Sequence, residues 1–175
     1  ILKEASTVSS RLNIPVYLVG GSVRDKLIGK KNCKDIDLMV EKDSEKFSNE
    51  LAKQLNIKKV IKFEKFYTYR IPYPEIEIEI AAARKETYNS DSRKPSTVTL
   101  TSIKEDLSRR DFTVNAIAAS LMKENFGELY DPLNGISDLN KGALITPKDP
   151  DVTFSDDPLR MLRAIRFATT LNFTL

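Results

Sequence analysis

Two aspartates, Asp35 and Asp37, have the residue type and spacing to bind a divalent metal ion. If residues 35–40 form a β-strand, its side chains alternate between two faces, so the aliphatic residues at even positions face one side and both carboxylates the other. Carboxylates held side by side repel unless a cation lies between them, and Mg²⁺ prefers oxygen ligands together with waters and substrate phosphates. The pair predicts a magnesium site, although an isolated Asp-x-Asp more often marks a solvated strand face.

A glycine turn precedes the aspartates. Val16–Val19 has the composition of a short buried strand, Gly20 and Gly21 follow it, and we expect a helix capped by Ser22 to run to about Ile28. Two glycines permit a tight turn and a close approach of the main chain to a ligand, and the N–H groups at the start of a helix can bind phosphate. The turn is only a weak indication of a phosphate site, because many α/β turns share its pattern.

A third carboxylate is expected from the run Glu75–Ile80, in which glutamate and isoleucine alternate. This alternation predicts a half-buried strand with Glu75, Glu77 and Glu79 on its exposed face. One of the three would complete a three-carboxylate metal site if the strand lay beside residues 35–40. The periodicity does not say which one.

Two arginines, Arg109 and Arg110, stand immediately before a run that reads as a helix capped by Asp111, with a buried stripe over residues 114–121. Arginines next to the positive end of a helix are electrostatically unfavourable unless an anion is bound there. Basic clusters are usually solvated faces. We nevertheless interpret this placement as an indication of phosphate binding.

The other elements follow from periodicity and turn residues. We expect helices over Ile1–Leu12, Ser44–Asn56 and Asp157–Leu171, and a short helix that begins at Ser102. We expect strands over Ile57–Phe63 and Phe66–Ile71. A mobile basic loop is expected over Arg84–Thr97 and a linker over Thr146–Asp151. In the last helix, we expect Met161, Ala164, Ile165, Ala168 and Leu171 to face a core while the arginines line another side.

Composition limits the classes of function. The 175 residues, 41% hydrophobic and 30% charged, suit one domain or one domain with the start of another, and we expect a fragment of a longer protein. The absence of histidine excludes histidine-dependent triads and His-ligated zinc within the chain. A single cysteine, Cys33, excludes an internal disulfide and fits a cytoplasmic protein. The net charge of +3 is mild, and no apolar run approaches membrane-spanning length, so no membrane partner is expected.

Six runs of the sequence stand in a characteristic order. They are LVGGSVRDKLIG (18–29), DIDLMV (35–40), EIAAARKETY (79–88), DLSRRDFTVNAIA (106–118), DPLNGISDL (131–139) and DDPLRMLRAIRFA (156–168). Together they resemble the catalytic head of the class II tRNA nucleotidyltransferases (CCA-adding enzymes) and bacterial poly(A) polymerases, in the polymerase-beta nucleotidyltransferase superfamily. The resemblance covers nearly the whole chain. It implies an α+β fold, with a mixed or antiparallel sheet flanked by helices, in which a head over residues 1–145 is followed by the start of a helical neck over residues 146–175.

The resemblance also implies a metal site. Asp35, Asp37 and Glu79 would be the catalytic residues and would bind two Mg²⁺ ions, since Glu79 has the family's acidic-x-x-x-x-Arg spacing to Arg84. One ion would lower the pKa of an RNA 3′-hydroxyl, and the other would hold the triphosphate and its leaving pyrophosphate. In-line attack on the α-phosphate would then extend the RNA by one nucleotide.

The family assigns further residues to nucleotide binding. These are Gly20, Gly21, Arg24, Arg109, Arg110, Asp111, Asn115, Asp157, Arg160 and Arg163. By this resemblance, Asp157 and Arg160 would together address the Watson–Crick edge of the incoming base, and Asp156 stands where the family usually has glutamate. Asp25 is expected to brace the glycine turn, while Arg163 is either a nucleotide-site residue or a structural ion-pair partner.

The function implied by the resemblance is template-independent addition of C and/or A, from CTP or ATP, to the 3′ end of tRNA. The alternatives are a poly(A) polymerase acting on general RNA 3′ ends, a catalytically inactive head that binds RNA or nucleotide, a structural α+β domain, and a nucleotidyltransferase that modifies proteins or small molecules. Loss of a metal ligand would favour the inactive head, yet all three carboxylates are present. The choice among CCA, A and CC addition and poly(A) tailing depends on neck, body and tail segments beyond the head.

Overall fold

A computed structural model of the protein describes residues 1–30, 35–89 and 92–175, so Cys33 lies outside the described residues. Its elements form two compact units. The first unit comprises Ile1–Ala83 with Ala118–Tyr130, and the second comprises Arg84–Ile117 with Asp131–Leu175. None of the helices within the described residues is long and apolar enough to cross a membrane.

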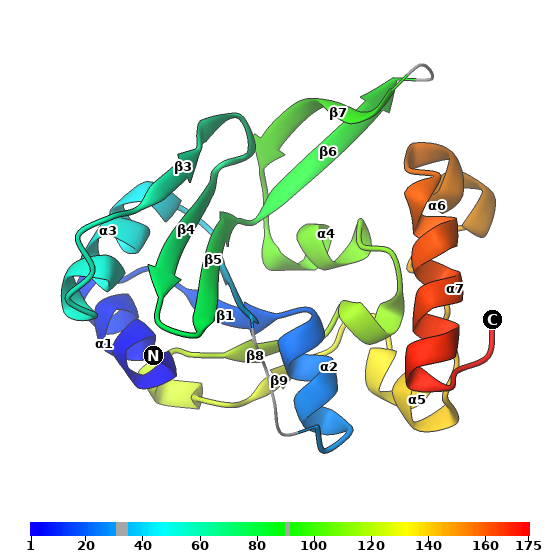
Figure 1. The fold of residues 1–175 in the computed structure, drawn as a ribbon, viewed down its shortest axis with the longest axis horizontal. Helices are drawn as coiled ribbons and strands as arrows, with labels where there is room; N and C mark the ends of the chain where they lie inside the picture. Colours follow the sequence, from blue (N-terminus) through cyan, green and yellow to red (C-terminus); the bar gives the residue numbers. More distant parts are fainter. Residues whose placement is uncertain (31–34, 90–91) are drawn as a thin grey trace. The chain divides into compact units, whose positions relative to one another are not determined.

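The first unit is built on one mixed sheet with the strand order β3-β4-β5-β2-β1-β8-β9 (Figure 1). Its strands are β1 (Val16–Val19), β2 (Asp35–Val40), β3 (Ile61–Phe63), β4 (Thr68–Tyr73), β5 (Ile76–Ala82), β8 (Ala118–Ser120) and β9 (Leu129–Tyr130). Neighbours run antiparallel except β2 and β5, which run parallel. The predicted α+β class with a mixed sheet is confirmed.

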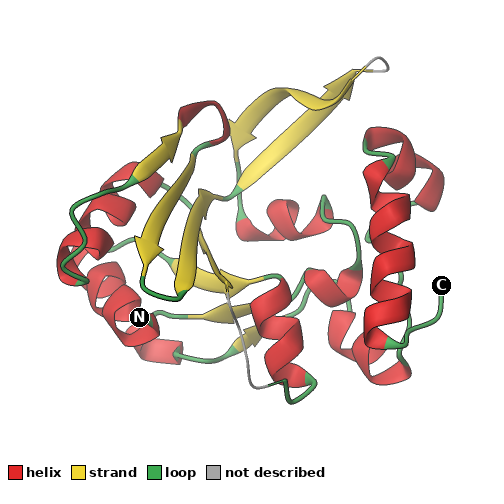
Figure 2. Cartoon of the chain, viewed as in Figure 1, coloured by secondary structure: helices red, strands yellow, loops and turns green. Residues whose placement is uncertain are grey.

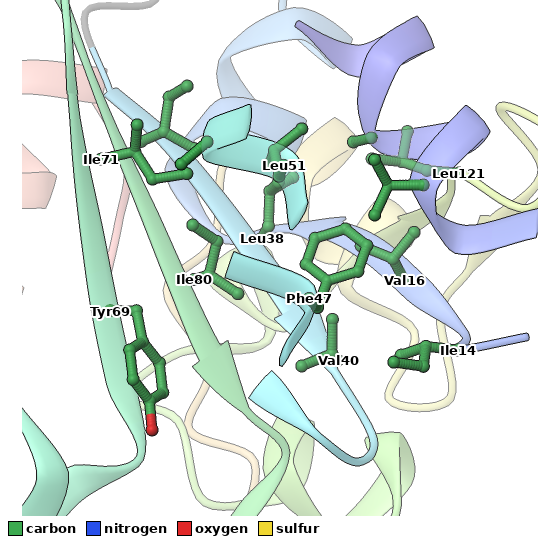
Figure 3. Packing of buried hydrophobic residues seen from close by; sticks show 14 residues of the cluster. Ile14, Val16, Leu38, Val40, Phe47, Leu51, Tyr69, Ile71, Ile80 and Leu121 are labelled. Carbon is green, nitrogen blue, oxygen red and sulfur yellow. The ribbon is translucent and has the colours of Figure 1, made fainter. Parts of the chain in front are cut away.

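Two amphipathic helices, α1 (Leu2–Leu12) and α3 (Ser44–Gln54), supply the core of the first unit. Figure 3 shows Phe47 and Leu51 of α3 among Leu38, Val40 and Ile80 of the sheet, all of them buried. Leu38 and Ile80 alternate along their strands with Asp37 and Glu79. The carboxylates therefore lie on the opposite face of the sheet from this core.

The second unit contains a hairpin, three short helices and the longer helix α7 (Figure 2). Its elements are β6 (Arg84–Asn89), β7 (Ser92–Leu100), α4 (Ile103–Ser108), a 3₁₀ turn η2 (Thr113–Asn115), α5 (Gly135–Lys141), α6 (Pro150–Asp156) and α7 (Leu159–Leu171). Its core contains Phe112 and Phe167, whose rings meet edge to face at 6.0 Å between centroids, together with Leu139 and Leu144.

The mobile basic loop expected over residues 84–97 is wrong where the structure describes it. Residues 84–89 and 92–100 form the antiparallel strands β6 and β7. Thr87 and Thr97 are register partners, and their hydroxyl groups hydrogen-bond across the hairpin. β-Branched residues at facing positions favour pairing, a signal that the charged residues of this stretch obscured.

The helix expected to begin at Asp111 is also wrong. The chain instead makes the short turn η2 and then enters β8, where Leu18 of β1 is the partner of Ala119. The predicted stripe over 114–121 does contain buried residues, namely Val114, Ile117, Ala118 and Leu121. Pairing with β1 outweighs the helix propensity of the alanines, which is only a weak preference.

Two expectations near the C-terminal end need correction. The linker over residues 146–151 is shorter than expected, because α6 begins at Pro150 and is capped by Asp149, whose Oδ1 accepts from the N–H of Asp151 at 2.9 Å. In α7, Met161 and Ile165 are 48% and 60% exposed instead of facing a core, whereas Phe167 and Arg160 are buried. The expected core face of α7 is therefore confirmed at Ala164, Ala168 and Leu171, which pack in the core of the second unit, and is wrong at Met161 and Ile165.

Candidate active site

Four acidic residues of the first unit lie at facing positions on two neighbouring strands. In the parallel pair β2–β5, Asp35 is the register partner of Glu77, and Asp37 is the partner of Glu79. Asp35 is exposed, and Asp37 and Glu79 are half-buried. Glu75 lies outside β5, in a turn with φ 63°, so the expectation that it shares the strand face is wrong. The neighbour of Asp37 is Glu79.

The donor set suits a hard divalent cation, because it consists of carboxylate oxygens alone. Among the described residues, however, no three acidic side chains are gathered closely enough to hold a metal ion. One oxygen of Glu79 instead lies 3.3 Å from Nη2 of Arg70. The residues thus fit magnesium in chemistry and in register, while the carboxylate of Glu79 is held by an arginine.

The glycine turn lies between β1 and α2 (Gly21–Leu27) of the same unit. Gly20 has φ 73°, a conformation that residues with a Cβ rarely adopt, so glycine is required at this position. The helix begins two residues earlier than expected, with Gly20 and not Ser22 as the capping residue. Ser22 instead donates its hydroxyl to the carbonyl oxygen of Asp35 at 2.8 Å, and thereby ties the turn to the start of β2.

Arg24 of α2 is 7% exposed and donates through Nε to Oδ1 of Asp25 at 2.8 Å. Nη2 of Arg24 lies 2.7 Å from the same oxygen. The carboxylate of Asp25 therefore fixes the guanidinium of Arg24 beside the glycine turn. This arrangement agrees with a bracing role for Asp25.

In the second unit, Arg109 and Arg110 converge on the buried carboxylate of Asp106. Arg109 donates to Oδ1 of Asp106 through Nη2 at 2.6 Å, and Arg110 donates to Oδ2 through Nη2 at 3.1 Å. Arg109 also forms an ion pair with Glu86 at 3.1 Å. Because no helix begins at Asp111, and Arg109 caps the C-terminal end of α4, the argument that an anion must compensate these arginines is wrong. Carboxylates of the protein compensate them.

The ionisation of Asp106 depends on these arginines. Burial raises the pKa of its carboxyl group. The charges of Arg110 and Arg109 and the hydrogen bonds to the carboxylate lower the pKa by a larger amount, so that the pKa lies below its ordinary value of 3.8. A depressed pKa means that the ionised form stabilises the folded state. This contribution is fully present above pH 3.8 and is lost as the pH falls through the lower pKa of the folded protein.

Replacing Asp106 by asparagine is expected to lower the free energy of unfolding by about 3 kcal/mol near neutral pH, because two partly buried arginines lose their shared counter-ion. Urea denaturation of Asp106→Asn and of the matched control Asp151→Asn, an exposed carboxylate in α6, measures this. The control should change stability by less than about 0.5 kcal/mol. The difference between wild type and Asp106→Asn should shrink as the pH falls below 3.8; a constant difference would contradict the charge argument.

Asp111 is the centre of a second polar cluster in the same unit. Its Oδ1 accepts from the side-chain amide of Asn115 at 3.0 Å, and its Oδ2 accepts from Nε of Arg163 at 2.7 Å. Nη2 of Arg163 lies 2.6 Å from the same oxygen. Arg163 thus forms an ion pair with Asp111, itself one of the predicted nucleotide-site residues.

The predicted base-reading pair has contacts within the protein. Arg160 is 8% exposed and donates through Nη2 to the carbonyl oxygen of Arg109 at 3.0 Å and through Nη1 to that of Thr153 at 3.4 Å. Asp157 accepts from the main-chain N–H of Leu159 at 3.1 Å. A guanidinium has five N–H donors, so these two contacts do not use all of them.

The predicted site residues therefore fall into two groups, one in each unit. Gly20, Gly21, Arg24, Asp35, Asp37 and Glu79 belong to the first unit, and Arg109, Arg110, Asp111, Asn115, Asp157, Arg160 and Arg163 to the second. Three residues in contact with these groups were not predicted, namely Arg70, Glu86 and Asp106. Asp106 was detectable, because it lies three and four residues before the two arginines, the spacing of helical ion pairs. Arg70 depends on the strand register, which the sequence does not specify.

Comparison with known proteins identifies the family. A family model described as the poly A polymerase head domain matches residues 16–145, most of the chain. The chain belongs to this family. The A-adding tRNA nucleotidyltransferase of Aquifex aeolicus is 43% identical to this chain. The matched part covers 91% of this chain and 19% of that protein. The A-adding tRNA nucleotidyltransferase of Halalkalibacterium halodurans is 36% identical over 99% of the chain and 40% of that protein.

Solved structures agree with this assignment of the head domain. An apo form of a CCA-adding enzyme superposes with a TM-score of 0.87 at 39% identity, covering 99% of this chain and 40% of that one. A tRNA nucleotidyltransferase complexed with a primer tRNA and an incoming ATP analog superposes with a TM-score of 0.82 at 36% identity, covering 98% of this chain and 46% of that one. The chain thus spans less than half of the length of these relatives.

Proposed function

We propose that the protein carrying this head domain is an enzyme that adds C and/or A, from CTP or ATP, to the 3′ end of tRNA. The observation that carries the proposal is the strand register, which sets Glu79 beside Asp37 on the face of the sheet opposite the core. The relatives that support a tRNA substrate are A-adding tRNA nucleotidyltransferases and CCA-adding enzymes. A reducing, cytoplasmic setting is consistent with the single cysteine.

We assign the metal site to Asp35, Asp37 and Glu79, with two Mg²⁺ ions as the proposed cofactor. When bound, the metal would supply charge stabilisation at the transferred phosphoryl group and a more acidic 3′-hydroxyl. The carboxylates provide the oxygen ligands, and the rigid pairing of β2 with β5 fixes the spacing between them. Little covalent chemistry is required of the protein in such a transfer, so the absence of histidine is no obstacle.

We assign triphosphate binding to Gly20, Gly21 and Arg24 of the first unit. The support is local: Gly20 adopts a positive φ that its missing Cβ allows, and Asp25 orients the guanidinium of Arg24. In the second unit, we assign Arg109, Arg110, Asp111, Asn115 and Arg163 to the nucleotide site. Asp106 and Glu86 hold the arginines at 109 and 110, and Asp111 holds Asn115 and Arg163.

Base choice is proposed to depend on Asp157 and Arg160. Replacing Arg160 by lysine keeps the charge but removes the planar donor fork, so we expect UTP or GTP to be accepted more readily while the Mg²⁺ dependence is unchanged. The measurement is the ratio of single-nucleotide addition rates for the four NTPs in the full-length protein. Arg166→Lys, an exposed arginine of the same helix, is the matched control and should leave the ratios unchanged. A uniform loss of rate in Arg160→Lys would assign Arg160 to its main-chain contacts instead.

A second candidate function is poly(A) tailing of general RNA, which the name of the matching family favours. The two are separated by giving the full-length protein four RNAs: tRNAs ending before CCA, after C and after CC, and an unrelated RNA, each with one NTP at a time. Our proposal predicts one to three additions of C and/or A to tRNA only. Long A tracts on the unrelated RNA would contradict it.

We also propose that the head ends near residue 145 and that residues 146–175 begin a helical neck. The family match ends at residue 145, and the helices α6 and α7 follow that point. A protein cut after residue 145 should therefore keep the first-unit sheet.

A further inference from the structure

An arginine lies in the same row as the carboxylates of the proposed metal site. In the antiparallel pair β4–β5, Arg70 is the register partner of Glu79, which is in turn the partner of Asp37 in β2. Side chains at facing positions of adjacent strands project from the same face of a sheet. Arg70 therefore shares the face on which Asp35, Asp37 and Glu79 lie.

The guanidinium of Arg70 contacts two glutamates of β5. Its Nη2 donates to Oε2 of Glu79 at 3.3 Å, and its Nε lies 2.8 Å from Oε1 of Glu77, in ion-pair range but without hydrogen-bond alignment. The guanidinium carbon of Arg70 lies 5.3 Å from the centroid of the Phe63 ring, within cation–π distance. The cation is thus fixed by Phe63 and the two glutamates.

Without a bound metal, the guanidinium of Arg70 is the positive partner of the Glu79 carboxylate. If Glu79 is the third metal ligand, its carboxylate oxygens must bind the metal. The guanidinium and the divalent cation then compete for the same negative charge. We propose that Arg70 competes with the divalent cation for Glu79 and thereby sets the metal affinity of the site. The inference rests on the proposed function, because it assigns a residue to that site.

The sign of the effect follows from charge. Arg70 holds Glu79 in the metal-free protein, and its positive charge also repels a cation placed beside Asp37. Both effects weaken metal binding. At separations of several ångströms near a protein surface, removing one charge is expected to tighten the binding of a divalent ion by roughly tenfold.

The test is a titration of the full-length protein with Mn²⁺, without nucleotide or RNA, in which free Mn²⁺ is measured by electron paramagnetic resonance and Mg²⁺ is added as a competitor. Arg70→Gln should bind Mn²⁺ roughly tenfold more tightly than wild type. Lys62→Gln is the matched control, since Lys62 is a cation of the neighbouring strand β3 that pairs with Glu45 of α3. Its Mn²⁺ affinity should equal that of wild type.

A double-mutant cycle separates competition for Glu79 from a general charge effect. In a Glu79→Gln background, Arg70→Gln should tighten Mn²⁺ binding by clearly less than it does in the wild-type background, because the repulsion from the arginine is still removed but Glu79 is no longer there to be released. Unchanged or weaker binding by Arg70→Gln, or equal tightening in both backgrounds, would overturn the proposal. Failure of the proposed metal site itself gives a different result, in which Asp37→Ala binds Mn²⁺ as wild type does.

Discussion

Replacing Asp37 by alanine in the full-length protein is expected to reduce the rate of nucleotide transfer by roughly a thousandfold or more, because the transition-state charge loses its principal stabilisation. Asp37 lies in the row formed by β2 and β5, on the face opposite the buried side chains of Leu38 and Val40. Its removal therefore leaves the core intact and relieves repulsion from Asp35 and Glu79. The free energy of unfolding should change by less than about 1 kcal/mol.

The measurement combines a single-turnover transfer assay in excess Mg²⁺ with urea denaturation of the same preparation. Glu128→Ala is the control, since Glu128 is an exposed carboxylate of the same unit that lies immediately before β9. It should retain the wild-type rate. Transfer by Asp37→Ala within about tenfold of wild type would contradict the metal assignment.

The second large effect is expected at Glu79. Glu79→Gln should lower the transfer rate by roughly a hundredfold or more, because glutamine keeps the shape of the side chain but removes the charge that faces Asp37. Glu77→Gln and Glu75→Gln should stay within about threefold of wild type. The structure gives each a different reason: Glu77 faces Asp35 and pairs with Arg70, whereas Glu75 lies in the turn before β5.

The three glutamates thus form an internally controlled series, since all three substitutions remove one carboxylate charge from neighbouring positions. Transfer rates for the three variants should be compared at saturating and at limiting Mg²⁺. Equal losses at all three positions, or the greatest loss at Glu77, would show that the third ligand has been assigned to the wrong residue.

Strand alternation predicted the placement of Asp35 and Asp37 opposite the core well, because its signal is local. The run at residues 35–40 places aliphatic and acidic side chains on opposite faces, and the structure has β2 at these residues. The sequence could not choose among Glu75, Glu77 and Glu79 by periodicity alone. That choice depends on the register between β2 and β5 and on a turn conformation at Glu75, which are set by tertiary packing.

The errors also have physical causes. Residues 118–120 were expected in a helix, but they pair with β1, and long-range pairing of this kind leaves no local pattern. Arg109 and Arg110 were interpreted as uncompensated, because they were expected to precede a helix, whereas they follow the end of α4 and pair with Asp106 of that helix. The contacts of Arg160 with main-chain carbonyls could not be predicted from the sequence either, because every residue has a carbonyl group and none is marked as the partner by its side chain.

We propose that the full-length protein transfers single nucleotides to the 3′ end of tRNA with metal bound at Asp35, Asp37 and Glu79. The most direct measurement is extension of a tRNA ending after CC by the full-length protein with ATP, resolved to one nucleotide, with pyrophosphate release followed in the same reaction. The account predicts one added A and one pyrophosphate per extended tRNA, restored by Mg²⁺ after chelation and lost in Asp37→Ala. Extension that persists in a chelator, or that Asp37→Ala performs at the wild-type rate, would contradict it.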